Sequence, residues 1–123
     1  MRRFAILFGF FSLAPVVAAH AAGDPTAGQH DFASTCAACH SVQAGQNKFG
    51  PSLAGVVGRP SGTAPGYHYS TAMSQAHLTW DADTLSKFIT NSQGLVHGTK
   101  MYVSVSNSQT RDDIIAYLGT VAH

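Results

Sequence analysis

The sequence predicts an all-α protein with four or five short helices separated by loops rich in glycine and proline. Several short segments place apolar residues three and four positions apart behind a capping residue, which is typical of amphipathic helices. No segment of the 123 residues alternates apolar and polar side chains for long enough to indicate a sheet. We therefore expect helix-on-helix packing.

The first predicted helix begins after Asp24, has a proline at its first position and continues to about Cys36. The four-residue spacing of Gly28, Phe32 and Cys36 places them on one face of this helix. Because Gly28 has no side chain, we expect it to let the last helix cross at close range, with Tyr117 against Phe32.

The middle of the chain predicts a long loop and then two helices. Residues 48–65 contain four glycines and three prolines, which indicates a structured loop. A short helix is predicted over residues 69–75, and another after Asp81 or Thr79 as its cap. The apolar side chains that share one face of this second helix are Leu85, Phe88 and Ile89.

The last predicted helix begins near Thr110. Asp113 follows three residues later, which approximates a capping box. Gly119 is expected to mark the end of the helix. The apolar residues of its buried face are Ile114, Tyr117 and Leu118.

The N-terminal segment has the layout of a secretory signal peptide. Two arginines precede an almost entirely apolar run, and small residues with an A-x-A pattern follow at 19–21. We therefore expect residues 1–21 to be removed and residues 22–123 to form one mature domain. A retained membrane anchor is the alternative, but the apolar stretch 4–17 is short for a spanning helix and contains Pro15.

The charge of the chain changes when this segment is removed. The formal net charge of +1 includes the two N-terminal arginines. The mature chain keeps five lysines and arginines against six aspartates, and it has no glutamate. No basic stripe is present, which argues against a nucleic-acid partner.

The most informative motif is the run Cys36-Ala37-Ala38-Cys39-His40. This spacing is used to attach a c-type haem. Two thiols on the same side of a helical turn can each form a thioether with a haem vinyl group, and the adjacent imidazole can bind the iron as its proximal ligand. We therefore predict one haem c per chain, covalently attached through Cys36 and Cys39, with His40 on the iron.

Two other kinds of protein site use a similar spacing of cysteines. A structural zinc site needs four cysteine or histidine ligands, whereas this chain has only two cysteines. A thioredoxin-like redox pair should follow a strand in a βαβ unit, and no such segment surrounds the motif. Haem attachment also agrees with export, because it is expected outside the cytoplasm of a bacterium.

Further short motifs occur in order along the chain, at spacings compatible with one another. Among them are Gly23-Asp24-Pro25, Gly50-Pro51-Ser52-Leu53, Gly58-Arg59, Ala64-Pro65-Gly66-Tyr67, Gly98-Thr99-Lys100-Met101 and Ile115-Ala116-Tyr117-Leu118. With the cysteine motif, they resemble the class I cytochromes c of the mitochondrial type and its soluble bacterial relatives. The resemblance covers nearly all of the mature chain. It implies a cytochrome c fold, with short helices and loops wrapped around the haem.

The resemblance also implies an axial ligand pair. Met101 would be the distal iron ligand, although a lone methionine more often fills a gap in a core. Met73, the other methionine of the mature chain, is expected to be a packing residue. The carbonyl of Pro51 would accept a hydrogen bond from the second ring nitrogen of His40 and so fix the tautomer that binds iron.

Four further residues resemble the family's polar wall around the haem propionates. They are Arg59, Tyr67, Tyr69 and Trp80. The alternative for each is an ordinary surface arginine or ordinary aromatic packing. Of the remaining histidines, His20 belongs to the predicted signal peptide, and we expect His30, His68, His77 and His123 on the surface.

Three residues depart from the family pattern, all on the side of Met101. His97 replaces a proline, Phe88 replaces a tyrosine that often donates to the methionine sulfur, and Val103 replaces a large aromatic residue. These changes predict a labile bond between Met101 and iron, with His97 or Lys100 able to replace the methionine at raised pH.

If both axial positions are filled, no substrate can bind the iron, which can only change its oxidation state. We therefore predict a soluble, monomeric, periplasmic single-electron carrier and not an enzyme. Its expected partners are a membrane quinol-oxidising complex and a terminal oxidase or dehydrogenase. Because the mature chain has few lysines, docking should depend little on a basic ring. The alternatives are a peroxidase-like haem enzyme that acts when Met101 dissociates, and a redox subunit of a larger complex.

Overall fold

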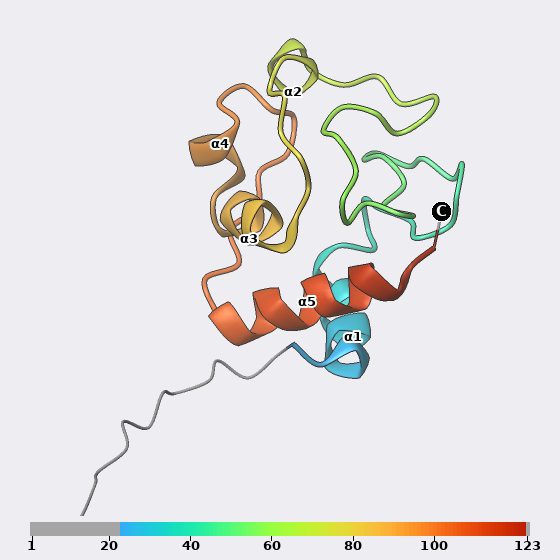
Figure 1. Cartoon of the computed structure of the whole chain (residues 1–123), viewed down its shortest axis with the longest axis vertical. Helices are drawn as coiled ribbons and strands as arrows, with labels where there is room; N and C mark the ends of the chain where they lie inside the picture. The colour runs from blue at the N-terminus through green and yellow to red at the C-terminus, as the bar shows by residue number, and fades with distance from the viewer. Residues whose placement is uncertain (1–22, 123) are drawn as a thin grey trace, which may run out of the picture.

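A computed structural model describes residues 23–122 and shows an all-α arrangement (Figure 1). The predicted signal peptide, residues 1–21, lies outside the described residues. Within the described range the only β interaction is an isolated bridge between Pro60 and Thr79. The helices are α1 (Pro25–Thr35), α2 (Thr71–Ser74), α3 (Ala82–Thr90), α4 (Ser92–Leu95) and α5 (Ser108–Thr120).

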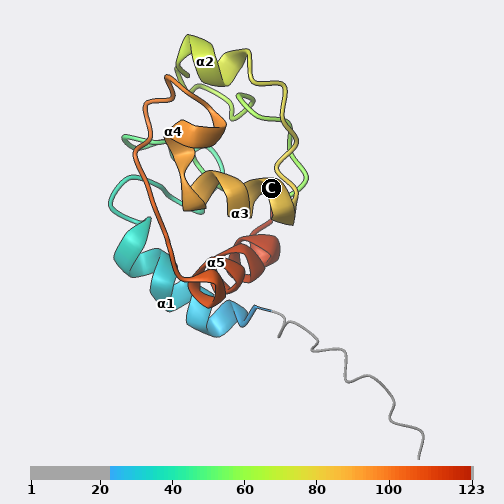
Figure 2. The ribbon, with the colours of Figure 1, turned by 90° about the vertical axis from the view of Figure 1, so that its left-hand side faces the viewer.

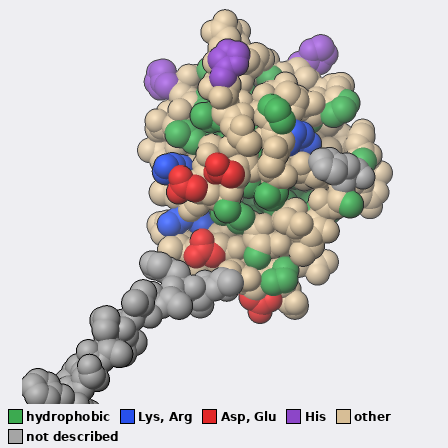
Figure 3. Space-filling view, in the orientation of Figure 1, with side chains coloured by type: hydrophobic (Ala, Val, Ile, Leu, Met, Phe, Trp, Pro, Cys, Tyr) green, Lys and Arg blue, Asp and Glu red, His purple; other side chains and the backbone are tan. Residues whose placement is uncertain are grey.

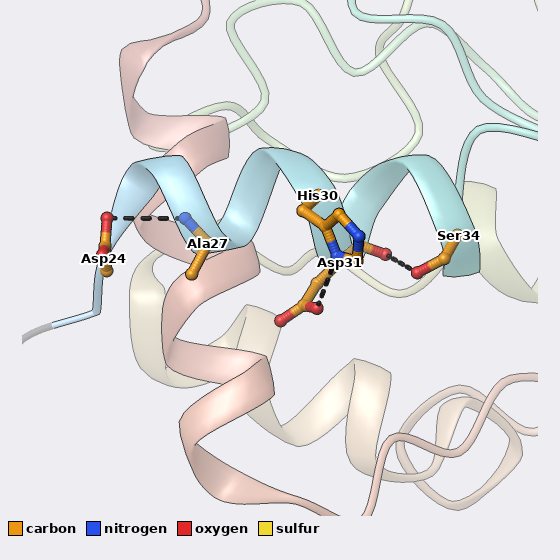
Figure 4. Close-up of polar contacts among 5 residues, drawn as sticks. All are labelled: Asp24, Ala27, His30, Asp31 and Ser34. Atoms are coloured by element: carbon orange, nitrogen blue, oxygen red, sulfur yellow. Dashed lines mark hydrogen bonds and ion pairs between the residues drawn. The ribbon is translucent and has the colours of Figure 1, made fainter.

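Helix α1 begins and ends close to its predicted bounds. The carboxylate of Asp24 accepts the backbone N–H of Thr26 at 2.8 Å and, as Figure 4 shows, that of Ala27 at 3.4 Å. These bonds satisfy donors that the first turn leaves without partners. Later in the helix, the ring of His30 lies 3.7 Å from the Asp31 carboxylate and is 87% exposed, so this ion pair contributes little stability.

Helices α1 and α5 cross each other at one end of the molecule in both ribbon views (Figures 1 and 2). A Cβ atom at Gly28 would overlap the backbone carbonyl of Asp113, so only glycine permits this approach. The rings of Phe32 and Tyr117 pack with their centroids 5.5 Å apart. The crossing predicted from the sequence is therefore confirmed.

The start of α5 differs from the prediction. The helix begins at Ser108, and its cap is Asn107, whose side chain accepts the N–H of Thr110 at 3.0 Å. Asp113 is buried and caps nothing in its own helix. Its carboxylate accepts the backbone N–H of Asp24 at 2.7 Å and so joins the start of α1 to α5.

The remaining helices are short and depend on side-chain caps. Helix α2 is shorter than the predicted segment 69–75 and is capped by Ser70. Asp81, and not Thr79, caps α3. Helix α4 was not predicted; its cap is Asn91, whose side chain accepts the N–H of Gly94 at 3.0 Å. Residues 48–65 form a loop without a helix, as predicted.

The buried apolar side chains form one cluster that draws on α1, α2, α3, α5 and the intervening loops. The cluster contains Met73, which confirms its packing role, and Met101 packs against it while partly exposed. No helix within residues 23–122 combines the length and apolar character that crossing a membrane requires. The cluster members are Phe32, Val56, Met73, Trp80, Leu85, Phe88, Val96, Ile114, Ile115 and Leu118.

Candidate functional site

The chain turns at the end of α1 and presents the two thiols and the imidazole of the cysteine motif. The backbone N–H groups of Cys39 and His40 both donate to the carbonyl of Cys36, at 3.1 and 3.0 Å. Cys36 is half-buried, Cys39 is exposed, and neither is in a disulfide. Burial, and then the neighbouring Cys39, raise the pKa of the Cys36 thiol to about 11.

The ring of His40 is buried and its orientation is fixed. Its Nδ1 lies 2.8 Å from the carbonyl oxygen of Pro51, so Nδ1 donates and the lone pair of Nε2 is left free. The ring also packs on Gly50, where a Cβ atom would lie 2.7 Å from Nδ1. Burial lowers the pKa of His40; the Pro51 carbonyl opposes this shift and Lys48 adds to it. The neutral ring is the form that binds a metal.

Met101 lies in an irregular segment after α4. Its carbonyl accepts two hydrogen bonds of 2.8 Å, one from Ser92 Oγ and one from Gln93 Nε2. Sequence reasoning missed both of these α4 residues. The available signal was Asn91, a favoured N-cap residue directly before Ser92.

Arg59 has one unpaired buried donor. Its Nη1 donates to the Ala54 carbonyl at 2.8 Å and its Nη2 to the Ser52 carbonyl at 3.3 Å. Its Nε atom is buried and has no hydrogen-bond partner among the described residues. The side chain lines a cavity of about 300 Å³. A guanidinium with a free buried N–H is suited to bind an anion.

The three predicted aromatic residues of the propionate wall differ in the donors they can offer. The hydroxyl of Tyr67 donates to the carbonyl of Phe49 at 2.9 Å, so its proton is already used. The hydroxyl oxygen of Tyr69 accepts the N–H of Ala64 at 3.0 Å and keeps its own proton. Trp80 is buried, and its ring packs on Phe88 with the centroids 5.0 Å apart.

The other histidines and the acidic residues do not assemble a second site. Within the described range no three His, Cys, Asp or Glu side chains come together in a way that could hold a metal ion. His30, His68 and His77 are exposed, as predicted, and so is His97. His20 and His123 lie outside the described residues.

The comparisons with known proteins agree on one family. The family model described as cytochrome c matches residues 25–122. The chain belongs to the cytochrome c family. Over 100 residues it is 50% identical to cytochrome c2 of Rhodopila globiformis, which covers 80% of this chain and 94% of that protein. It is 45% identical to cytochrome c of Euglena viridis over 100 residues, 80% of this chain and 98% of that protein.

A solved structure supports the fold of this cytochrome c. Cytochrome cH from Methylobacterium extorquens superposes with a TM-score of 0.74 at 43% identity, and the match covers 80% of this chain and 99% of that chain. The all-α cytochrome c fold predicted from the sequence is thus confirmed.

Membership of the family defines the cofactor and the type of activity. This cytochrome c binds haem c covalently and transfers electrons, and it is not an enzyme. The residues present fit that group. The chain has two cysteines, both with free thiols, and the buried His40 ring keeps Nε2 free beside them. The buried Nε of Arg59 has no partner among the described residues, so this N–H could donate to an anionic group such as a propionate.

Proposed function

We propose that this cytochrome c is a periplasmic single-electron carrier whose iron is bound by His40 and Met101. The observation that carries the proposal is the His40 ring. It follows the second cysteine directly, it is buried, and its Nδ1 is committed to the Pro51 carbonyl. Only Nε2 is therefore left to bind a metal.

Each remaining site residue has a role in this proposal. Cys36 and Cys39 form the thioethers, and Arg59, Tyr69 and Trp80 direct N–H or O–H donors to the propionates. Tyr67, whose proton goes to the Phe49 carbonyl, instead ties residues 49 and 67 together. The bound haem supplies a one-electron couple, which no protein side chain here could provide.

The two residues that would bind the iron, His40 and Met101, are each held in place by hydrogen bonds. His40 is fixed by the Pro51 carbonyl, and the backbone of Met101 is fixed by hydrogen bonds from α4. Because these hydrogen bonds join protein groups only, they would persist when a bound iron changes charge and would keep the reorganisation on electron transfer small. With both positions filled by side chains, no substrate can bind the iron.

The proposed partners are redox proteins: a membrane quinol-oxidising complex as electron donor, and a terminal oxidase as acceptor or a dehydrogenase. The cytochrome would meet each of them as a monomer. Two exposed aromatic residues support docking through apolar contact: Phe49 is 79% exposed and Tyr102 is 83% exposed. Phe49 precedes the glycine that packs on His40, and Tyr102 follows Met101. On the face in Figure 3, acidic and basic side chains lie close together rather than forming a patch of one sign.

Mass spectrometry and optical spectroscopy of the exported protein test the proposal. We expect the mass of the chain without residues 1–21 plus one haem, and a near-infrared sulfur-to-iron charge-transfer band in the ferric state. A Cys39→Ser variant, which keeps one anchor, is the control for covalent attachment. A bare chain mass would contradict haem attachment. Rapid binding of carbon monoxide to the reduced protein would favour an open-site haem enzyme.

A further inference from the structure

The segment that carries Met101, residues 98–103, is fastened by side chains of α4. Ser92 Oγ donates to the Met101 carbonyl at 2.8 Å and accepts the N–H of Val103 at 3.1 Å. Ser92 is 1% exposed, so water cannot compete for either bond. One buried hydroxyl thus fixes the backbone on both sides of Tyr102.

Gln93 adds a second attachment to the same segment. Its Nε2 donates to the carbonyls of Thr99 and Met101, both at 2.8 Å, and its Oε1 accepts the N–H of Gly98 at 3.3 Å. The Met101 carbonyl therefore receives two donors, which fill both of its lone pairs.

Helix α4 is anchored independently of these bonds. Asn91 caps it through the N–H of Gly94, and the N–H of Asn91 continues the last turn of α3 by donating to Lys87. Directly after α4, Val96 is 5% exposed and belongs to the core cluster. The two clamping side chains thus project from a support that is tied to the core.

We propose that Ser92 and Gln93 are positioning residues that hold Met101 on the haem iron. This inference rests on the proposed ligation by Met101. His97 stands where a proline would stiffen the segment, and the hydrogen bonds from α4 supply a different constraint on the same backbone. The clamp lowers the fraction of molecules in which the sixth iron position is open. An external ligand binds only the molecules in which this position is open, so its apparent affinity falls in proportion to the open fraction.

Comparing imidazole binding between purified ferric holoprotein variants reports how this fraction changes. Ser92→Ala removes the hydroxyl and Gln93→Met removes the amide, with little change in volume. We expect each variant to bind imidazole about tenfold more tightly than the unchanged protein, because each loses buried hydrogen bonds to the ligand-bearing backbone. The double variant should depart from the product of the two effects, since both side chains donate to one carbonyl.

Ser61→Ala is the matched control. It removes a hydroxyl that accepts the Leu78 N–H at 3.0 Å in another loop, and the imidazole affinity should not change. If Ser92→Ala does not fold, Gln93→Met, at a half-buried position, still decides the question.

Two results would contradict the proposal, each in a different way. Variants that unfold at a lower temperature but bind imidazole with the original affinity would show a purely structural role and overturn the inference. Absence of the sulfur-to-iron band in the unchanged protein would instead overturn Met101 ligation itself, and with it the basis of this inference.

Discussion

The side chain of Arg59 holds a loop through some of its nitrogens and leaves another buried nitrogen without a partner. Two of its nitrogens hold the loop carbonyls of Ala54 and Ser52, while the buried Nε has no partner among the described residues. A buried donor without a partner is costly unless a bound group completes it. A haem propionate is the anion that the cofactor of this family brings.

Replacing Arg59 with methionine should therefore change both the potential and the stability. If Arg59 lies beside the haem as proposed, loss of its positive charge stabilises the ferric state, so the midpoint potential should fall, by about 60 mV for each tenfold change in the redox equilibrium. The two carbonyls that lose their donor should cost on the order of 1–3 kcal/mol of unfolding free energy. Optical redox titration and thermal unfolding measure these effects.

Arg111→Met is the control for this change. It removes the same charge from α5, where the guanidinium donates to the carbonyls of Val105 and Ser106. Its effect on the potential should be smaller. Equal shifts for both variants would mean that only net charge matters and that Arg59 has no specific contact with a propionate.

At the scale of elements, the crossing of α1 and α5 depends on Gly28. Gly28→Ala places a methyl group against the Asp113 carbonyl and should destabilise the protein by about 3 kcal/mol, because backbone must move to admit it. Gly119→Ala, on the same helix pair but with nothing within 4 Å, is the matched control and should be neutral or slightly stabilising. Denaturant titration of both holoproteins compares them, and equal stabilities would refute the close-contact argument.

The cap of α3 should produce a pH dependence at low pH. Hydrogen bonds from Thr84, chiefly from its backbone N–H at 2.8 Å, lower the pKa of Asp81 below its ordinary value. A lowered pKa in the folded state means that the stabilisation is complete above the unfolded pKa and is lost as the pH falls through the folded pKa. The melting temperature of Asp81→Ala should lie a few degrees below that of the original protein at pH 7, and the two melting temperatures should converge in acid.

Asp81→Asn separates charge from capping. Asparagine caps helices as well as aspartate does, so this variant should keep most of the stability at pH 7 while losing the acid dependence that Asp81 contributes. A variant as unstable as Asp81→Ala at pH 7 would show that the charge, and not the hydrogen bond, is what stabilises α3.

The sequence predicted those helices that carry their own signals. Helices α1 and α3 have an acidic cap and apolar spacing, and Gly28 with Phe32 predicted the crossing of α5. Helix α4 is a single turn, too short for periodicity to show, and it is held by tertiary contacts. The start of α5 was placed two residues late because Asp113 bonds to Asp24 across the crossing and not to its own helix.

The features of the site likewise fall into those that could be predicted from the sequence and those that only the structure reveals. The cysteine motif was predictable because its spacing specifies it, whereas the bond between His40 and Pro51 was predicted only from the resemblance to the cytochrome c family. The bonds from Ser92 and Gln93 to Met101 join residues eight and nine positions apart through an irregular turn. No sequence rule gives the path of such a turn, so these contacts emerge only from the structure.

At the scale of the whole molecule, the distribution of charge predicts how the protein meets its partners. The amines of Lys48 and Lys100 donate to the carbonyls of Ala37 and His68 and are therefore held close to the surface. With few further cations, electrostatic steering should be weak. The rate of electron transfer to the proposed partner, a membrane oxidase, should change by less than about tenfold between low and physiological ionic strength.

Tyr102→Ser and Phe49→Ser examine the apolar part of the same encounter. Each should raise the apparent KM for the oxidase several-fold without changing the visible spectrum, because docking loses aromatic contact area while the haem site is untouched. A steep fall of rate with salt, together with no effect of either substitution, would mean that the protein docks through its charged residues.

The bond between the Asp24 N–H and the Asp113 carboxylate has a consequence for how the protein is made. Gly23 packs so closely that a Cβ atom there would overlap the Asp112 carbonyl. The proposed leader therefore joins the mature chain within two residues of a tight junction between the two terminal helices. Removal of residues 1–21, as proposed, would place the new N-terminus at residue 22, directly before the glycine that packs against α5.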